Sequence, residues 1–251
     1  MRIVSLGHAL FAATILVLGI WGLAEGQLSA VWQPSPKDTG LREALAYGCG
    51  LVCLVSGAGM PWRRTAAPAA GLLLAALLAW IAVFKAPTIF RAPGVVVSWE
   101  DCAETVVVTA GAWALYAALA KGWLAAGDVG VRIARILYGL GMVVFGVAHF
   151  AYAKETASLV PHWLPAHLAF AYGTGGAYVA AGLAVLSGVL APLAARLSAA
   201  QMGLFTLLVW VPAVAGGSKD PFTWSETVIS WVLTVAGWLV AESYRAGKAR
   251  T

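Results

Sequence analysis

Residues 132–153 read RIARILYGLGMVVFGVAHFAYA, and the only formal charges in this run are Arg132 and Arg135 at its start. A helix needs about 20 predominantly apolar residues to cross the hydrocarbon core of a bilayer. The run is long enough, and it lacks the alternation of apolar and polar residues that a β-barrel strand shows. It therefore predicts a membrane-spanning helix.

Seven further runs of the same kind occur in the chain, and the overall composition agrees with them. Of the 251 residues, 61% are hydrophobic and 11% are charged, with a mean hydropathy of +0.83. A soluble domain is nearer half apolar and a quarter charged, so the composition excludes a soluble enzyme. We predict an all-α, polytopic membrane protein. Its eight predicted spans are residues 3–24, 43–60, 66–84, 103–120, 132–153, 166–187, 197–215 and 226–242.

The Lys and Arg residues predict the orientation of the spans, because the cytoplasmic loops of membrane proteins carry an excess of positive charge. With both termini in the cytoplasm, ten of the 16 Lys and Arg residues lie inside, whereas nine of the 11 Asp and Glu residues lie outside. Lys85 is among the basic residues assigned to the outer segments. The net charge of +5 then reflects the excess of Lys and Arg on the cytoplasmic side of the membrane. It does not indicate a nucleic-acid-binding surface, so we expect no nucleic-acid partner. The expected location is a cell membrane, the inner membrane of a bacterium.

The two halves of the chain align without a gap from residue 44 to residue 113 when one is shifted by 125 residues. Matches of Trp, Pro, Tyr and Gly at one offset indicate an internal repeat. Each repeat holds four spans, so both enter the membrane in the same sense. We predict two tandem four-helix bundles, residues 1–120 and 132–251, joined by an inner linker at 121–131. The matched pairs include Tyr47 and Tyr172, Gly50 and Gly175, Pro87 and Pro212, Trp99 and Trp224, and Trp113 and Trp238.

Prolines and glycines predict local features of the spans. Pro87 and Pro212 are expected to end the third and seventh spans near the outer surface, where proline leaves no backbone group unpaired deep in lipid. The glycines at 48 and 50, and at 173, 175 and 176, are typical of helices that pack closely in a membrane.

Five short motifs stand out in the second half of the chain: Gly139-x-Gly141, Gly146-x-x-His149-Phe150, Val160-Pro161-x-Trp163-Leu164-Pro165, Tyr172-x-Thr174-Gly175 and Ala181-Gly182-Leu183. Together they resemble the DoxX-like (DoxX/DoxD) integral membrane proteins over residues 132–242. This family typically consists of small four-helix units, and it includes the membrane subunit of a thiosulfate:quinone oxidoreductase. The resemblance implies a redox-linked subunit that interacts with quinone at an outer-facing site in the second repeat. The family often has an acidic residue or a histidine where this chain has Tyr178.

His149 is the first candidate for a catalytic role, because ionisable side chains inside a membrane are costly and mark functional sites. A neutral imidazole can hydrogen-bond a quinone carbonyl and transfer a proton. The structural alternative is a hydrogen bond that holds a neighbouring helix. Glu226 is the second catalytic candidate, as a proton partner of His149 at the same outer level. Its alternative role is the capping box Thr223-x-x-Glu226, which parallels Ser98-x-x-Asp101 in the first half.

The predicted ligand-binding residues are His162, Trp163, His167, Tyr178 and Glu104. The two histidines flank Trp163-Leu164-Pro165 in an outer loop, and their spacing matches no common pair of metal ligands, so we predict no metal. Glu104 has Ile229 as its partner in the repeat, so the fold does not require an acid there. It is a candidate entry point for a cation or proton, and the alternative is an acidic face at headgroup level.

Three functions stay open from the sequence, and the sequence does not decide whether the protein is an enzyme. The first is the quinone-interacting, redox-linked role, with quinone as the ligand and a redox subunit as the partner. The second is a non-catalytic assembly partner in the bilayer, which the scarcity of polar groups in the spans favours. The third is a small-solute transporter, because parallel repeats are common in transporters.

Overall fold

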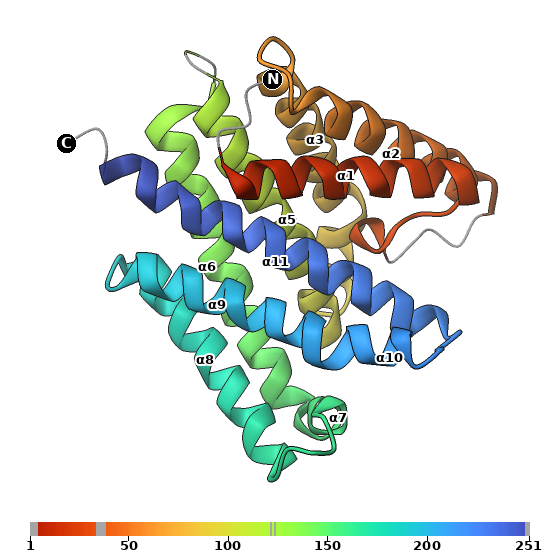
Figure 1. Cartoon of the computed structure of the whole chain (residues 1–251), viewed down its shortest axis with the longest axis vertical. Helices are drawn as coiled ribbons and strands as arrows, with labels where there is room; N and C mark the ends of the chain where they lie inside the picture. The colour runs from red at the N-terminus through yellow and green to blue at the C-terminus, as the bar shows by residue number, and fades with distance from the viewer. Residues whose placement is uncertain (1–4, 34–38, 121, 123, 249–251) are drawn as a thin grey trace.

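The computed structural model describes residues 5–33, 39–120, 122 and 124–248, and within them the chain is helical with no strand (Figure 1). Eight of these helices are long and apolar enough to cross a membrane, which confirms the prediction of an all-α, multi-pass membrane protein. The candidate spans are Leu6–Glu25, Thr39–Gly59, Ala66–Arg91, Val96–Leu119, Gly127–Ala151, His167–Ser187, Ala191–Ala215 and Pro221–Arg245.

Six spans are single helices, and two are divided by a π-helical turn. The single helices are α1 (Leu6–Glu25), α2 (Thr39–Gly59), α5 (Val96–Leu119), α6 (Gly127–Ala151), α8 (His167–Ser187) and α11 (Pro221–Lys248). The divided spans are α3 (Ala66–Trp80), η2 (Ile81–Lys85) and α4 (Ala86–Arg91), and α9 (Ala191–Phe205), η3 (Thr206–Trp210) and α10 (Val211–Ala215). Two short helices, η1 (Ala30–Trp32) and α7 (Ala153–Leu159), lie in loops.

The π-helical turns explain why the prediction for the two prolines is wrong. Pro87 and Pro212 do not end their spans; each is the second residue after a π turn, η2 or η3, and the helix continues beyond it. Proline lacks an N–H and its ring clashes with the carbonyl four residues earlier, so a regular α-helix cannot run through it undisturbed. The wider π turn accommodates this conflict. The two turns lie 125 residues apart in the chain.

The helices α5 and α11 begin earlier than the sequence predicts, so both predicted caps are wrong. Ser98 and Thr223 lie inside the helices, because α5 starts at Val96 without a side-chain cap and α11 starts at Pro221. Asp220 caps α11 instead: its carboxylate accepts hydrogen bonds from the backbone N–H groups of Phe222 and Thr223, both at 3.3 Å.

A tryptophan in the first turn of each of these two helices closes the preceding loop. The indole N–H of Trp99 donates to the carbonyl of Pro93 at 2.9 Å, and that of Trp224 donates to the carbonyl of Ser218 at 3.0 Å. In both cases the acceptor lies six residues before the donor. Both rings remain exposed, as aromatic side chains at a membrane interface are.

The helices α5 and α11 occupy the middle of the arrangement. α5 packs against α3, α6 and α11, and α11 packs against α1, α5 and α9, while α1 pairs with α2 and α6 with α8. The spans are not parallel: α1, α2, α9 and α11 run across Figure 1, whereas α6 and α8 run down it. α5 is the most enclosed of the candidate spans, because 72% of its most apolar 18-residue stretch is buried inside the protein.

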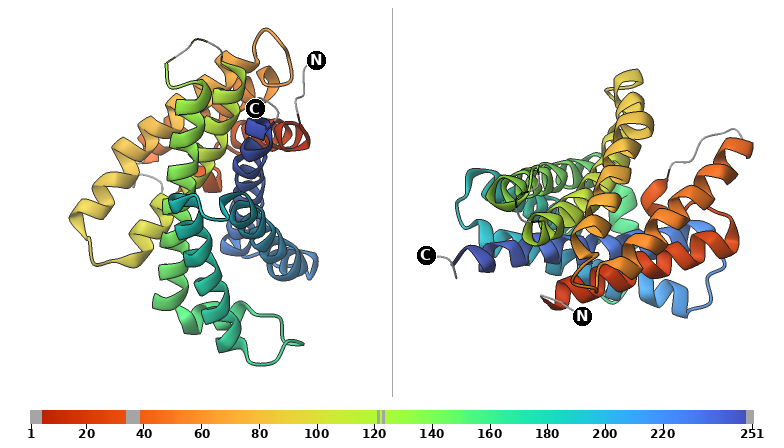
Figure 2. Two further views of the ribbon diagram at one scale, coloured as in Figure 1. Left: turned by 90° about the vertical axis from the view of Figure 1, so that its left-hand side faces the viewer. Right: turned by 90° about the horizontal axis from the view of Figure 1, so that it is seen from above.

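The start of α1 and the last turns of α11 lie together, at what we call the terminal end of the molecule (Figure 2). The Ser5 hydroxyl donates to Glu242 Oε2 at 2.5 Å, and the Gly7 backbone N–H donates to Glu242 Oε1 at 3.3 Å. Eight crossings of a membrane would put both termini on the same side. The starts of α5 and α11 lie near each other at the opposite end, where Glu104 is within electrostatic range of Glu226.

Glycine allows the closest approaches between helices. A Cβ atom on Gly111 of α5 would lie 2.7 Å from the Cα of Ala236 in α11, and one on Gly57 of α2 would lie 2.3 Å from the backbone N of Leu16 in α1. The predicted packing role of these glycines is confirmed at positions 50 and 175 and is wrong at 48, 173 and 176, where a Cβ would meet open space.

The substitution Gly111→Val should destabilise the protein, because the added methyl groups would force α5 and α11 apart. Overpacking of this kind costs about 1–3 kcal/mol. Thermal unfolding of the detergent-purified protein measures the effect, with Gly48→Val as the matched control. The control should unfold near the wild-type temperature, and an equal loss in both variants would contradict the close contact.

Candidate functional site

His149 lies in the last turn of α6, and its hydrogen bonding fixes its tautomer. The imidazole Nδ1 lies 2.8 Å from the backbone oxygen of Phe145. A carbonyl oxygen only accepts, so Nδ1 carries the proton and Nε2 of the neutral ring keeps its lone pair. Nε2 is buried and has no hydrogen-bond partner among the described residues. His149 is therefore a buried acceptor without a donor.

Aromatic rings from two other helices pack against this imidazole. The ring of Tyr178 in α8 lies 5.3 Å from it and that of Phe205 in α9 lies 5.8 Å away, both edge-on. Gly175 makes room for the contact, because a Cβ there would lie 2.8 Å from the Cβ of His149. The Tyr178 hydroxyl is paired with the side chain of Gln201. Tyr178 thus offers the imidazole its ring and not its hydroxyl.

An unpaired buried acceptor has an energetic cost that calls for an explanation. Leaving such a group without a partner costs about 1–3 kcal/mol, and most buried polar atoms in native proteins have a partner. A hydroxyl or N–H donor that reached His149 Nε2 would also meet the rings of Tyr178 and Phe205. Sequence reasoning found His149 and Tyr178, and the structure brings the two together.

The other histidines and Trp163 form a separate group at the surface. His162 and Trp163 lie in the loop before α8, and His167 is the first residue of α8. The two imidazole rings are 6.3 Å apart, and the Trp163 side chain is 72% exposed. No ring contact or hydrogen bond joins these three residues to His149 in the described part of the chain. Nor do three His, Cys, Asp or Glu side chains there form a group that could hold a metal.

Glu226 and Glu104 belong to a group of carboxylates at the opposite end, where α5 and α11 begin. Glu104 lies within electrostatic range of Glu226, and both lie within range of Asp101. Among the described residues, no interaction joins Glu226 to His149. The structure thus places the two predicted catalytic residues in different surroundings: His149 among aromatic rings, and Glu226 among carboxylates.

Lys85 is the ionisable residue that sequence reasoning missed. Its assignment to an outer loop is wrong, because the third span continues through η2 to Arg91 and buries the side chain to 1% exposure. The ammonium group donates to the backbone oxygen of Asp101 at 2.8 Å and to that of Gln33. It also lies within electrostatic range of Glu104.

A signal for this pairing was present in the sequence. At the offset that aligns the two halves, Lys85 matches Trp210 and Glu104 matches Ile229. One half thus carries a cation and an anion where the other half carries two apolar residues. A charge introduced into a membrane span needs a partner of opposite sign, so their joint occurrence in one half could have predicted the pair.

Comparison with protein-family models, with curated protein sequences and with solved structures finds no match to this chain.

Lys85 and Glu104 should be energetically coupled. Lys85→Met leaves two buried carbonyl oxygens without their donor and removes the cation near Glu104, and leaving buried acceptors unsatisfied costs about 1–3 kcal/mol. The double variant with Glu104→Leu should lose less than the sum of the single losses, by about 1–3 kcal/mol. Equilibrium unfolding in mixed micelles measures the cycle. Lys154→Met, at an exposed lysine, is the control, and additive losses would show that the two charges act independently.

Proposed function

We propose that the chain is a DoxX-like membrane protein built from two tandem four-helix repeats, residues 1–120 and 132–251, joined at 121–131. Three observations support the repeat. The π turns η2 and η3 lie at the offset that aligns the sequence halves, as do the Trp99 and Trp224 hydrogen bonds. In addition, Gly111 touches Ala236, which is its own equivalent in the second half. Contact between equivalent residues is expected on a two-fold axis.

The packing of the outer helices also supports a two-fold relation between the halves. α1 packs against α11, and α6 packs against α5. The first span of each half thus packs on the last span of the other half. An axis along the membrane normal, between α5 and α11, relates these pairs, as in parallel repeats. We place both termini in the cytoplasm of a bacterial cell, because that orientation puts most Lys and Arg residues inside.

We infer that the second repeat binds a membrane quinol or quinone at His149, and the unpartnered Nε2 carries this proposal. The lone pair at Nε2 suits the hydroxyl of a quinol, and the rings of Tyr178 and Phe205 suit its aromatic head. The resemblance to a family with a quinone-reactive member favours the same ligand.

The role of His149 in this proposal is that of a proton acceptor. Oxidation of a quinol releases two protons and two electrons. Nε2 takes one of the protons, while Nδ1 stays bonded to Phe145 and holds the ring in place. The second proton goes to water at the membrane surface, and a redox partner subunit takes the electrons.

Transport is a second candidate function, and Lys85 is the observation that favours it. Charges that are buried in a membrane protein and paired with each other commonly mark the path of an ion or proton. Lys85 and Glu104 lie within electrostatic range of each other, and Glu104 lies within range of Glu226 in α11. Proton or cation uptake into liposomes, compared between wild type and Glu104→Gln, separates this function from quinol binding.

His149→Phe tests the proposed quinol site. The variant keeps a ring of similar size but removes the acceptor, so quinol affinity should fall about tenfold, the value of one good hydrogen bond. Its thermal stability should stay near that of the wild type, because the variant loses the Nδ1 hydrogen bond to Phe145 but also removes the unsatisfied Nε2. Binding of a short-chain quinol to nanodiscs containing the protein measures the affinity.

His167→Phe is the control for this measurement, and it should bind the quinol as the wild type does. A large loss of stability in His149→Phe with unchanged binding would assign His149 to helix packing instead.

Cysteine labelling tests the proposed orientation. Leu124 in the linker is 93% exposed and Trp163 is 72% exposed at the other end. In intact cells a membrane-impermeant maleimide should label Trp163→Cys, and it should label Leu124→Cys only after permeabilisation. The unmodified protein is the control, since its three cysteines lie within helices. The reverse pattern would invert the orientation.

A further inference from the structure

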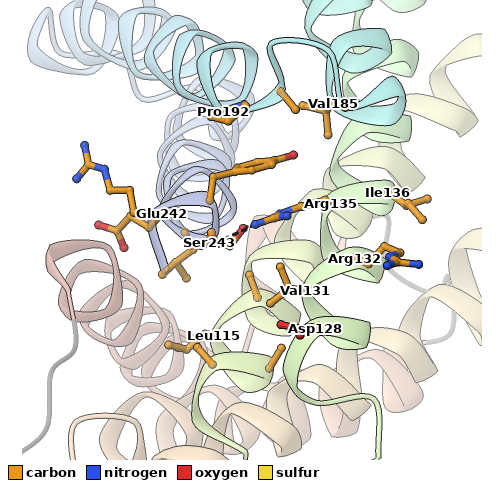
Figure 3. Close-up of a pocket in the computed structure, with 18 of the residues that line it drawn as sticks. Leu115, Asp128, Val131, Arg132, Arg135, Ile136, Val185, Pro192, Glu242 and Ser243 are labelled. Carbon is orange, nitrogen blue, oxygen red and sulfur yellow. Dashed lines mark hydrogen bonds between the residues drawn. The ribbon is translucent and has the colours of Figure 1, made fainter. Parts of the chain in front are cut away.

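A pocket of about 1260 Å³ opens at the terminal end of the molecule (Figure 3). The ends of α5 and α11, the start of α6 and the turn between α8 and α9 enclose it. Pockets for drug-sized ligands measure about 300–1,000 Å³, so this one can hold a larger molecule. It lies at the other end of α6 from His149 and shares no residue with that site.

Arg135 provides a fixed cation inside the pocket. Its Nε donates to the Ser243 hydroxyl at 3.1 Å and its Nη2 donates to the Ser243 carbonyl at 2.9 Å. The guanidinium also lies 3.7 Å from the centre of the Tyr244 ring. Figure 3 shows the side chain reaching across the pocket toward Ser243. A guanidinium has five N–H donors, and these contacts use two, so Arg135 holds further donors in a fixed position for a ligand.

The acidic residues of the pocket do not cancel its positive charge. Among the described residues, three arginines line it, at positions 132, 135 and 245, against two acids, Asp128 and Glu242. The Glu242 carboxylate is already engaged, since it accepts hydrogen bonds from the Ser5 hydroxyl and from the Trp238 indole N–H. Asp128 lies in the first turn of α6 and within electrostatic range of Arg135, so it offsets part of the positive charge.

One helix N-terminus adds to the positive potential. Ala191, the first residue of α9, lines the pocket, and the first turn of α9 holds no acidic residue. The N-terminus of a helix carries partial positive charge and favours anions. Together with Arg135 it makes the polar part of the pocket an anion site.

Apolar side chains complete the lining of the pocket, and some of them reach its exposed edge. Leu115 and Leu239 are buried, while Ile136 and Leu186 are 44% and 37% exposed. A ligand that fits both the basic and the apolar residues has an anionic head and a long apolar tail. Basic pockets between membrane helices bind the headgroups of anionic lipids.

We propose that this pocket binds an anionic glycerophospholipid, with its phosphate on Arg135 and its acyl chains along Ile136 and Leu186. The bound lipid contacts α5 from the first half of the chain and α6 and α11 from the second, so it joins the two halves at the terminal end. The proposal is independent of the quinol site.

Native mass spectrometry of the purified full chain, with phosphatidylglycerol and phosphatidylcholine added in turn, tests the proposal. The wild type should retain phosphatidylglycerol at least about tenfold more tightly than phosphatidylcholine, and Arg135→Gln should lose this preference. Arg196→Gln is the control: this exposed arginine of α9 does not line the pocket, and the variant should keep the preference.

Further arms of the experiment separate the sources of the phosphate. Thermal stabilisation by inorganic phosphate or glycerol 3-phosphate, equal to that by phosphatidylglycerol, would assign the pocket to a free phosphate and overturn the lipid. Equal retention of both lipids by the wild type, or an unchanged preference in Arg135→Gln, would also overturn it. Should Arg135→Gln fail to fold, Arg245→Gln at the rim should weaken the preference several-fold, and an unchanged preference there would count against the proposal.

Discussion

The contact between α5 and α11, where Gly111 meets Ala236, is the constraint on which the helix arrangement depends. In lipid, helices gain little from hydrophobic burial, so close packing of small residues has to hold them together. α3 and α6 pack against other faces of α5, and α1 and α9 pack against α11. Every remaining span therefore contacts this pair directly or through one neighbouring helix. The carboxylates at one end and the pocket at the other both lie between elements whose spacing this contact sets.

Hydrophobic run lengths predict the number of spans and their helical class because the thickness of the bilayer fixes both. They predict the ends poorly. α5 starts at Val96 and not at residue 103, because Glu100 and Asp101 interrupt the apolar run although the helix includes them. The rule that proline ends a helix fails for a related reason, since it does not consider a π turn. Trp99 and Trp224 mark both helix starts more reliably than the predicted caps do.

The sequence predicts some features of the candidate site and not others, as it does for the fold. The depth of His149 in its span follows from the sequence, and so does its nearness to α8, through Gly175 and Tyr178. Its separation from Glu226 does not follow, because a shared level in the membrane says nothing about which helices are neighbours. The sequence did not predict a buried Lys85, because the predicted third span ends at residue 84, one residue before it. The unpaired Nε2 of His149 can be recognised only in the folded structure.

The π turns have a consequence for the history of the chain. A π turn arises when one extra residue enters an α-helix, and each residue turns the helix by about 100°. Everything from Ala86 onward in the third span, and from Val211 onward in the seventh, therefore presents a different face than an uninterrupted helix would. If the two halves descend from one duplicated ancestor, that insertion is older than the duplication, and the ancestral unit of four helices already carried it.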